Sequence, residues 1–213
     1  MRIAIGGYEH LTSNYVTALS NLGVTPIVTL SISDKELTEY DGLLLPGGGD
    51  INPIFFYQSN TASQNIDTAL DVMQFTLLHQ FIEAKKPILG ICKGMQIINV
   101  HFGGNIVQHC HYAAFHEYKG NDQIHPITAN PQSFLARLYG TSFSVNSAHH
   151  QCLGRLGQNL SPIAYSNDNI IEAIIHDSLP IYGLQWHPER MCFSHQRNDT
   201  VDGSMVIKYC FQI

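Results

Sequence analysis

Short apolar runs and longer amphipathic segments alternate through the first hundred residues. The apolar runs are too short for helices and are bounded by Gly or Pro, which is typical of buried parallel strands. The longer segments repeat hydrophobic residues at three- and four-residue steps, as one face of a helix does. The pattern predicts strands at 2–5, 24–30, 42–45 and 87–91, and helices at 13–22, 67–84 and 93–102.

The second half of the chain has a different pattern. Its apolar runs are separated by Gly, Asn and Asp, which is typical of antiparallel hairpins. Neither a Pro/Gly/Ser-rich linker nor an internal repeat divides the sequence, so residues 1–213 are predicted to form one domain. We expect an α/β fold with a mostly parallel central sheet flanked by helices and a partly antiparallel C-terminal region. Strands are predicted at 124–128, 142–146, 162–166, 170–175 and 181–185, and a helix at 203–211.

Composition narrows the possible partners. The formal net charge is -6 and basic residues do not cluster, so a nucleic acid is not expected as a partner. The N-terminal apolar run is too short for a signal peptide, and no run reaches the roughly 18 residues of a membrane span. We therefore expect a cytoplasmic protein without membrane contact. Five cysteines without a CxxC pair disfavour a disulfide framework and a zinc ribbon.

The strongest local motif is a cysteine between a predicted strand and a predicted helix. Gly90 and Gly94 each stand two positions from Cys92, as in the GxSxG nucleophile elbow with sulfur in place of oxygen. The helix that starts at Lys93 directs its positive end at the sulfur, which favours the thiolate. The alternative is an inert cysteine buried between strand and helix.

A second motif supplies a base and a carboxylate. His187-Pro188-Glu189 directly follows a predicted strand. Pro188 favours an extended backbone at His187, and residues two apart in an extended chain face the same side. Glu189 could then orient the imidazole for a nucleophilic thiol. A surface turn with an incidental His and Glu is the alternative.

A glycine-rich loop follows the strand at 42–45. Gly47, Gly48 and Gly49 would allow a backbone with positive φ that turns its amides outward. Amides of Gly48 or Gly49, together with the amide of Lys93, could form an oxyanion hole. A flexible loop or a phosphate cradle are alternatives, although the Gly-Lys-Ser/Thr ending of a Walker loop is absent.

Together the three motifs form a complete set for acyl transfer. The segments PGGGDINP, GICKGMQIINV, FGGNIVQ, VNSAHHQ and LQWHPE, spread over 46–189, also carry a family resemblance. The chain resembles the class I glutamine amidotransferase-like superfamily, and within it the γ-glutamyl-γ-aminobutyrate hydrolase group of the C26 peptidase family. The resemblance implies a flavodoxin-like core and a triad of Cys92, His187 and Glu189.

The resemblance also implies a reaction. A γ-glutamyl amine would be cleaved through a cysteine thioester, without a cofactor, to glutamate and the amine. Lys93 after the nucleophile and the segment His149-His150-Gln151 favour this hydrolase group. The alternatives are a glutaminase subunit that passes ammonia to a synthetase on another chain, and an inactive binding module. A homo-oligomer is compatible with either enzyme.

One departure concerns the start of the long helix. Many members of the group have Arg-Asp-x-x-Glu there, whereas residues 70–74 read LDVMQ, so an Arg and a Glu are missing. The triad is unaffected, and the identity of the amine is left open.

Other polar residues are expected at or near the pocket. Gln96, His149 and His150 are predicted to bind substrate. The Lys93 side chain could assist the thiolate or a substrate carboxylate, or form a structural ion pair. A cluster of histidines close together in the sequence suggests a metal site. However, no second pair of ligands at a spacing usual for zinc accompanies it, so we expect a loop at the rim of the pocket instead. The residues concerned are His109, Cys110, His111, His116 and Glu117.

Overall fold

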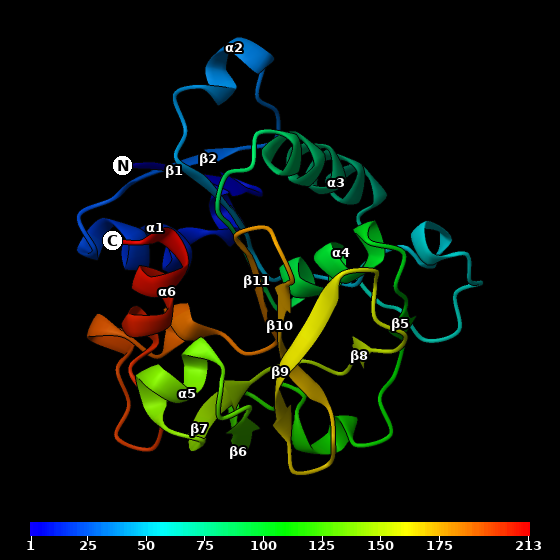
Figure 1. The fold of residues 1–213 in the computed structure, drawn as a ribbon. Coiled ribbons are helices and arrows are strands. Elements are labelled where there is room, and N and C mark those ends of the chain that lie inside the picture. Colours follow the sequence, from blue (N-terminus) through cyan, green and yellow to red (C-terminus); the bar gives the residue numbers. More distant parts are fainter.

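A nine-stranded sheet runs through the whole molecule. The computed structural model describes residues 1–213. Five parallel strands make up one half of the sheet, in the order β2-β1-β3-β4-β11 (Figure 1). The strand before Cys92 therefore lies near the middle of the sheet. These strands are β1 (Arg2–Gly6), β2 (Thr25–Thr29), β3 (Gly42–Leu45), β4 (Ile88–Ile91) and β11 (Ile181–Leu184).

Antiparallel strands extend the sheet beyond β11 in the order β10-β9-β6-β7. Two further short strands form a separate antiparallel pair. The sequence prediction of a partly antiparallel C-terminal region is confirmed. The four strands are β6 (Gln123–Ala129), β7 (Ser142–Ser147), β9 (Leu160–Ser166) and β10 (Ile171–His176), and the separate pair is β5 (Ile106–Val107) with β8 (Cys152–Leu153).

Helices cover both faces of the sheet and divide the core in two. Ile3 and Ile5 of β1 point into one cluster, where helices α1 and α6 pack, whereas Ala4 points into the other with α3 and α4. This alternation follows from the two-residue period of a strand. In Figure 1, α1 and α6 lie on one side of the sheet and α3 and α4 on the other. The helices are α1 (Ser13–Asn21), α2 (Asp34–Leu37), α3 (Thr68–Glu83), α4 (Lys93–His101), α5 (Phe134–Tyr139) and α6 (Gly203–Phe211).

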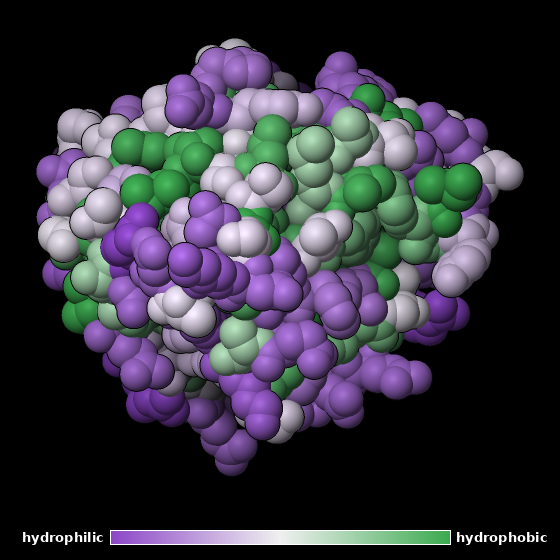
Figure 2. Space-filling model, turned by 90° about the horizontal axis from the view of Figure 1, so that it is seen from above, coloured by the Kyte–Doolittle hydropathy of each residue, from purple (hydrophilic) through white to green (hydrophobic).

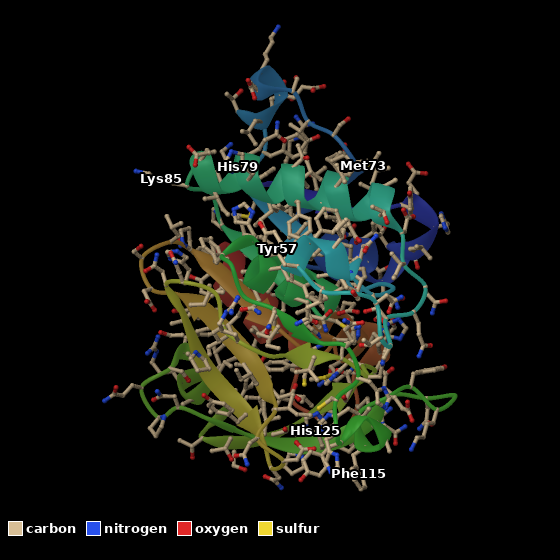
Figure 3. All side chains as sticks on the ribbon, turned by 90° about the vertical axis from the view of Figure 1, so that its right-hand side faces the viewer. Tyr57, Met73, His79, Lys85, Phe115 and His125 are labelled. Atoms are coloured by element: carbon tan, nitrogen blue, oxygen red, sulfur yellow. The ribbon has the colours of Figure 1, made fainter.

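The surface mixes polar and apolar residues. Seen from above, hydrophobic patches are separated by polar residues (Figure 2). Figure 3 shows α3, which carries Met73 and His79, towards one end of the molecule, and His125 and Phe115 at the other. None of the helices combines the length and hydrophobicity that a membrane span requires.

The predicted strands and long helices are all present, but, besides the 3-10 turns, four short helices and strands were not predicted. These are α2, α5 and the two-residue strands β5 and β8. Each is at most six residues long, so too few side chains are available to establish a period. The fold class inferred from the sequence is confirmed.

Candidate active site

The turn between β4 and α4 fixes the position of Cys92. Its backbone has φ 52° and ψ −106°, outside the conformations that a residue with a side chain prefers. A methyl group at Gly94 would lie 2.1 Å from the Leu45 carbonyl oxygen, and one at Gly90 would lie 2.5 Å from the Gly94 carbonyl oxygen. Both glycines are therefore needed for close packing under the elbow, as the GxCxG motif predicted. The Cys92 amide donates to the Leu184 carbonyl on β11 at 2.7 Å, which ties the turn to the neighbouring strand.

The base follows β11. His187 Nδ1 donates to Glu189 Oε1 at 2.8 Å, and both side chains are buried. Asn146 holds the His187 backbone from both sides, because its Oδ1 accepts from the His187 amide and its Nδ2 donates to the His187 carbonyl. The predicted contact forms, but not in an extended chain: Pro188–Arg190 is a 3-10 turn that brings the carboxylate back to the imidazole.

Electrostatics favour a charged pair between the thiol and the imidazole. Burial alone would raise the pKa of the Cys92 thiol, but the adjacent His187 imidazole, together with the charges of His149 and Arg190, outweighs burial and holds that pKa below its ordinary value. For His187, burial opposes protonation, but the Glu189 carboxylate and the Cys92 sulfur raise the pKa to about 9. The pair therefore favours a thiolate beside an imidazolium, which is the reactive form of a cysteine nucleophile.

The glycine loop faces this pair, although not through the conformation that the sequence suggested. None of Gly47, Gly48 and Gly49 has a positive φ, so the expectation of a left-handed backbone was wrong. Close approach explains two of these glycines instead: a methyl group at Gly47 would lie 2.8 Å from His187 Cε1, and one at Gly49 would lie 2.1 Å from the Asn65 carbonyl oxygen.

Candidate oxyanion donors remain in this loop. The Gly47 amide is occupied, because it donates to the Tyr15 hydroxyl at 2.9 Å. The amides of Gly48 and Gly49 have no acceptor on the backbone. Lys93 is the first residue of α4, so its amide has no partner inside the helix. An oxyanion hole from these amides stays a prediction that the backbone arrangement supports.

A small polar pocket of about 190 Å³ opens in front of the thiol. Cys92 and the three predicted oxyanion residues contribute to its wall, as do all three predicted substrate-binding residues. His187 lies outside this wall, and its ring and the Cβ atom of Cys92 both approach Gly47. The lining residues are Gly48, Gly49, Asp50, Gln64, Asn65, Cys92, Lys93, Gln96, Ala148, His149, His150 and Gln151.

Each predicted substrate-binding residue has a defined contact. Gln96 Nε2 lies 3.5 Å from Gln185 Oε1, and His149 Nδ1 lies 2.9 Å from the Gln151 carbonyl oxygen. His150 Nε2 lies 2.9 Å from Asp50 Oδ2, and this hydrogen bond raises the pKa of His150. The pocket thus presents a carboxylate and an imidazole side by side at its wall.

The Lys93 side chain turns away from the thiol. Its Nζ lies 2.7 Å from Asp71 Oδ1, and only 2% and 0% of the two side chains are exposed. Of the alternatives for this side chain, the structural ion pair is confirmed. Asp71 is the residue of the Arg-Asp-x-x-Glu pattern that this chain retains, and Gln74 at the Glu position donates to the Gly6 carbonyl at 2.7 Å, which a carboxylate could not do.

We expect Lys93→Met to lower the free energy of unfolding by about 3–5 kcal/mol, because the Asp71 carboxylate would stay buried without its cation. Urea denaturation followed by circular dichroism measures this loss. Adding Asp71→Asn to Lys93→Met should recover a large part of it. A loss below about 1 kcal/mol in the single variant would contradict a strong buried pair.

Four supporting residues were not predicted. Tyr15 holds the glycine loop, Asp71 pairs with Lys93, Asn146 holds His187, and Arg190 Nε lies 3.5 Å from Glu189 Oε1. Asn146, Arg190 and Asp71 had a signal, since the first two belong to or adjoin a motif that carries the resemblance and Asp71 is the retained residue of the Arg-Asp-x-x-Glu pattern, whereas Tyr15 had none.

The chain is similar to proteins of one known family over most of its length. The Peptidase C26 family model matches residues 3–189. The glutamine amidotransferase-like protein YvdE of Lactococcus lactis subsp. lactis is 33% identical over 193 residues, covering 85% of this chain and 81% of that protein. The γ-glutamyl-γ-aminobutyrate hydrolase PuuD of Escherichia coli K12 is 26% identical, covering 85% of this chain and 79% of that protein. A crystal structure of a protein described as part of a GMP synthase, from Thermoplasma acidophilum, has a TM-score of 0.73 at 23% identity, covering 100% of this chain and 92% of that protein.

Proposed function

Because the chain belongs to the peptidase C26 family, we propose that it hydrolyses the γ-glutamyl amide bond of a γ-glutamyl amine and releases glutamate and the amine. The observation that carries this proposal is the Cys92 thiol on a strained elbow, beside the buried His187–Glu189 pair and open to a polar pocket.

The reaction follows from the positions of these groups. The Cys92 thiolate attacks the γ-carbonyl carbon, and the developing oxyanion accepts hydrogen bonds from amides of Gly48 or Gly49 and Lys93. The His187 imidazolium then donates its proton to the leaving nitrogen as the C–N bond breaks, which leaves a γ-glutamyl thioester. Water attacks the thioester while His187 accepts a proton, and glutamate leaves with the thiolate restored.

The pocket wall suits the glutamyl part of the substrate. The Asp50 carboxylate can attract an α-ammonium group, and the positive charge that its hydrogen bond favours on His150 can attract an α-carboxylate. The small volume of the pocket and its mostly polar residues fit an amino-acid head group better than an apolar ligand.

A glutaminase subunit is the second candidate. Its support is specific, because the relative with 33% identity carries a glutamine amidotransferase-like name. Both candidates share the triad and the thioester, so they differ in the fate of the amine and in dependence on a partner. The segment His149-His150-Gln151 at the pocket wall favours the hydrolase.

Steady-state kinetics on glutamine and on a panel of γ-glutamyl amines separate these candidates. We expect kcat/KM for at least one γ-glutamyl amine to exceed that for glutamine by about tenfold or more, equal to about 1.4 kcal/mol of transition-state stabilisation. Hydrolysis of glutamine alone, rising when a synthetase is added, would support the glutaminase. Inactivity on the whole panel would favour a binding module.

A further inference from the structure

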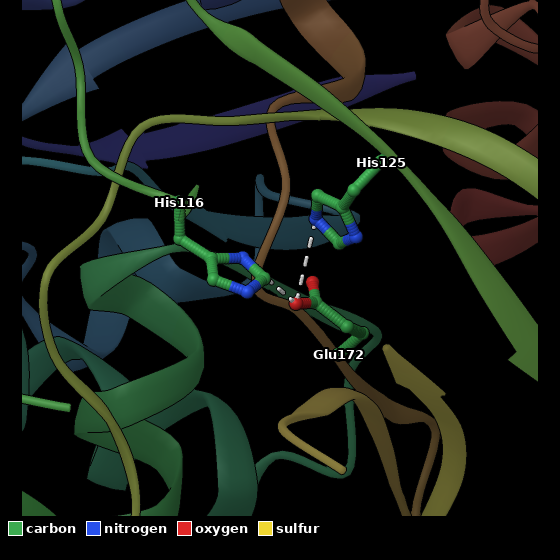
Figure 4. A group of neighbouring side chains, drawn as sticks. All are labelled: His116, His125 and Glu172. Atoms are coloured by element: carbon green, nitrogen blue, oxygen red, sulfur yellow. Dashed lines mark ion pairs between the residues drawn. The ribbon is translucent and has the colours of Figure 1, made fainter. Parts of the chain in front are cut away.

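A second cluster of histidines, buried or partly buried, surrounds a buried carboxylate away from the thiol. Glu172 lies on β10 and is 0% exposed. His125 Nε2 lies 3.6 Å from its Oε1 atom, and His116 Nδ1 lies 3.8 Å from the same atom. Figure 4 shows both rings directed at this carboxylate, one from the loop before β6 and one from β6 itself. One ligand atom from each residue lies within 4.8 Å of the other two.

The outer nitrogen of each ring is already engaged. His116 Nε2 lies 2.9 Å from Asp168 Oδ2, and His125 Nδ1 lies 3.3 Å from the Pro126 carbonyl oxygen. These oxygen atoms can only accept, so the outer nitrogen of each ring carries the hydrogen. In a neutral ring the other nitrogen, which faces Glu172, then has the free lone pair. A carboxylate or carbonyl behind each imidazole is the usual arrangement around histidines that bind metal.

The carboxylate itself lacks partners. Neither Oε1 nor Oε2 of Glu172 has a hydrogen bond, and His125 Nε2 has none either. Separations of 3.6–3.8 Å are too long for hydrogen bonds. A buried carboxylate without hydrogen bonds is costly, and a cation between these atoms would stabilise it.

The geometry points to that cation, and we propose that His116, His125 and Glu172 bind one zinc ion. Two imidazole nitrogens and one carboxylate oxygen are ligands that Zn²⁺ prefers. Ligand atoms at about 2.0–2.2 Å from a tetrahedral ion lie about 3.4 Å apart, close to the observed 3.6 and 3.8 Å. A surface cavity of about 350 Å³ is lined by both histidines, and also by Asp168 and Pro126 at their outer nitrogens, so solvent reaches the outer side of the two rings.

Two neighbours of the cluster are not part of the proposed ligand set. His149 Nε2 is 3.8 Å from the same Glu172 oxygen, but this residue lines the pocket of Cys92. Ser147 Oγ is 3.3 Å from His116 Nδ1, and its hydroxyl is 3.0 Å from the His116 carbonyl oxygen, where it donates its hydrogen. Of the five residues that the sequence marked as metal candidates, only His116 belongs to the proposed site.

A zinc ion here would join β10 to β6 and the loop just before it. His116 precedes β6, His125 lies on β6, and Glu172 lies on β10, which pairs with β9 rather than with β6. Zinc binding to the folded chain should therefore raise its melting temperature.

The test uses the full-length chain after removal of metal with EDTA. Isothermal titration with ZnCl₂ should show one equivalent bound, and the melting temperature should rise. With CoCl₂ in place of ZnCl₂, a visible absorption band of a four-coordinate ion should appear. These measurements do not depend on the proposed hydrolase activity.

Substitutions of the proposed ligands test whether the bound zinc ion occupies this site. His125→Asn and Glu172→Gln should each weaken zinc binding by about 100-fold or more, since even the loss of a supporting contact costs 10–100-fold. His111→Asn, an exposed histidine of the same loop, serves as the matched control and should bind as the wild type does. Absence of binding to the wild type would overturn the proposal. Unchanged binding in His125→Asn, which should fold because the residue is partly exposed, would also overturn it.

Discussion

Replacing Cys92 with alanine should lower kcat/KM by about 10⁴-fold or more while the protein stays folded. The thiol is the atom that forms the thioester, and no other cysteine lies in the pocket wall. Loss of a nucleophile in comparable triads leaves only the contribution of binding and the oxyanion hole. Turnover of the best γ-glutamyl amine and thermal unfolding should be measured side by side.

Cys210→Ala provides the matched control. Cys210 is also buried, lies on α6 and is absent from the pocket. Burial raises the pKa of its thiol, so that cysteine is expected to be unreactive. This control should keep its activity, and a covalent glutamine analogue bearing a chloromethyl ketone should label the wild type at Cys92. Activity that survives Cys92→Ala would show that the nucleophile lies elsewhere.

Glu189→Gln should lower kcat/KM by about 10²–10⁴-fold. The carboxylate orients His187 through the 2.8 Å contact and stabilises its protonated form. An amide at this position would keep the size of the side chain but remove the charge, as comparable changes at the acidic member of a triad do. An activity within about threefold of the wild type would contradict the assignment of Glu189.

The same variant should change the pH profile in a definite direction. The reactive pair requires thiolate at Cys92, which is present above a pKa lowered by His187, and imidazolium at His187, which is lost above about pH 9. The wild-type kcat/KM should therefore fall on both sides of a plateau, with the alkaline limb near pH 9. Removing the Glu189 charge lowers the pKa of His187, so this limb should move to lower pH. An unchanged alkaline limb would assign it to another group.

Local patterns were sufficient to predict the elbow and its strands. The run from Ile88 to Gly94 combines a buried strand, two glycines at close-packed positions and a helix start, so its geometry is largely determined by neighbouring residues. The glycine loop shows the limit of such reasoning. Its glycines were correctly associated with the site but for the wrong reason, because the constraint at Gly47 is the ring of His187, far later in the chain.

Contacts across the fold could not be predicted from the sequence. The Asp71–Lys93 pair joins α3 to α4, and Tyr15 on α1 supports the loop after β3. The Glu172 cluster combines a loop and two strands, and no regular spacing relates its members. A motif within one segment carries no information about which distant segment packs against it.

The sheet changes from parallel to antiparallel pairing at β11, and this change separates the residues that break the bond from those that line the rest of the pocket. The thiol, the base and the glycine loop follow β4, β11 and β3, which are all parallel strands. His149, His150 and Gln151 lie instead between β7 and β8, in the antiparallel part. On the proposed function, substitutions in that second part change how the glutamyl group is held while the bond-breaking groups keep their positions. Binding of the glutamyl group should therefore be adjustable through residues 148–151 with little change to the triad.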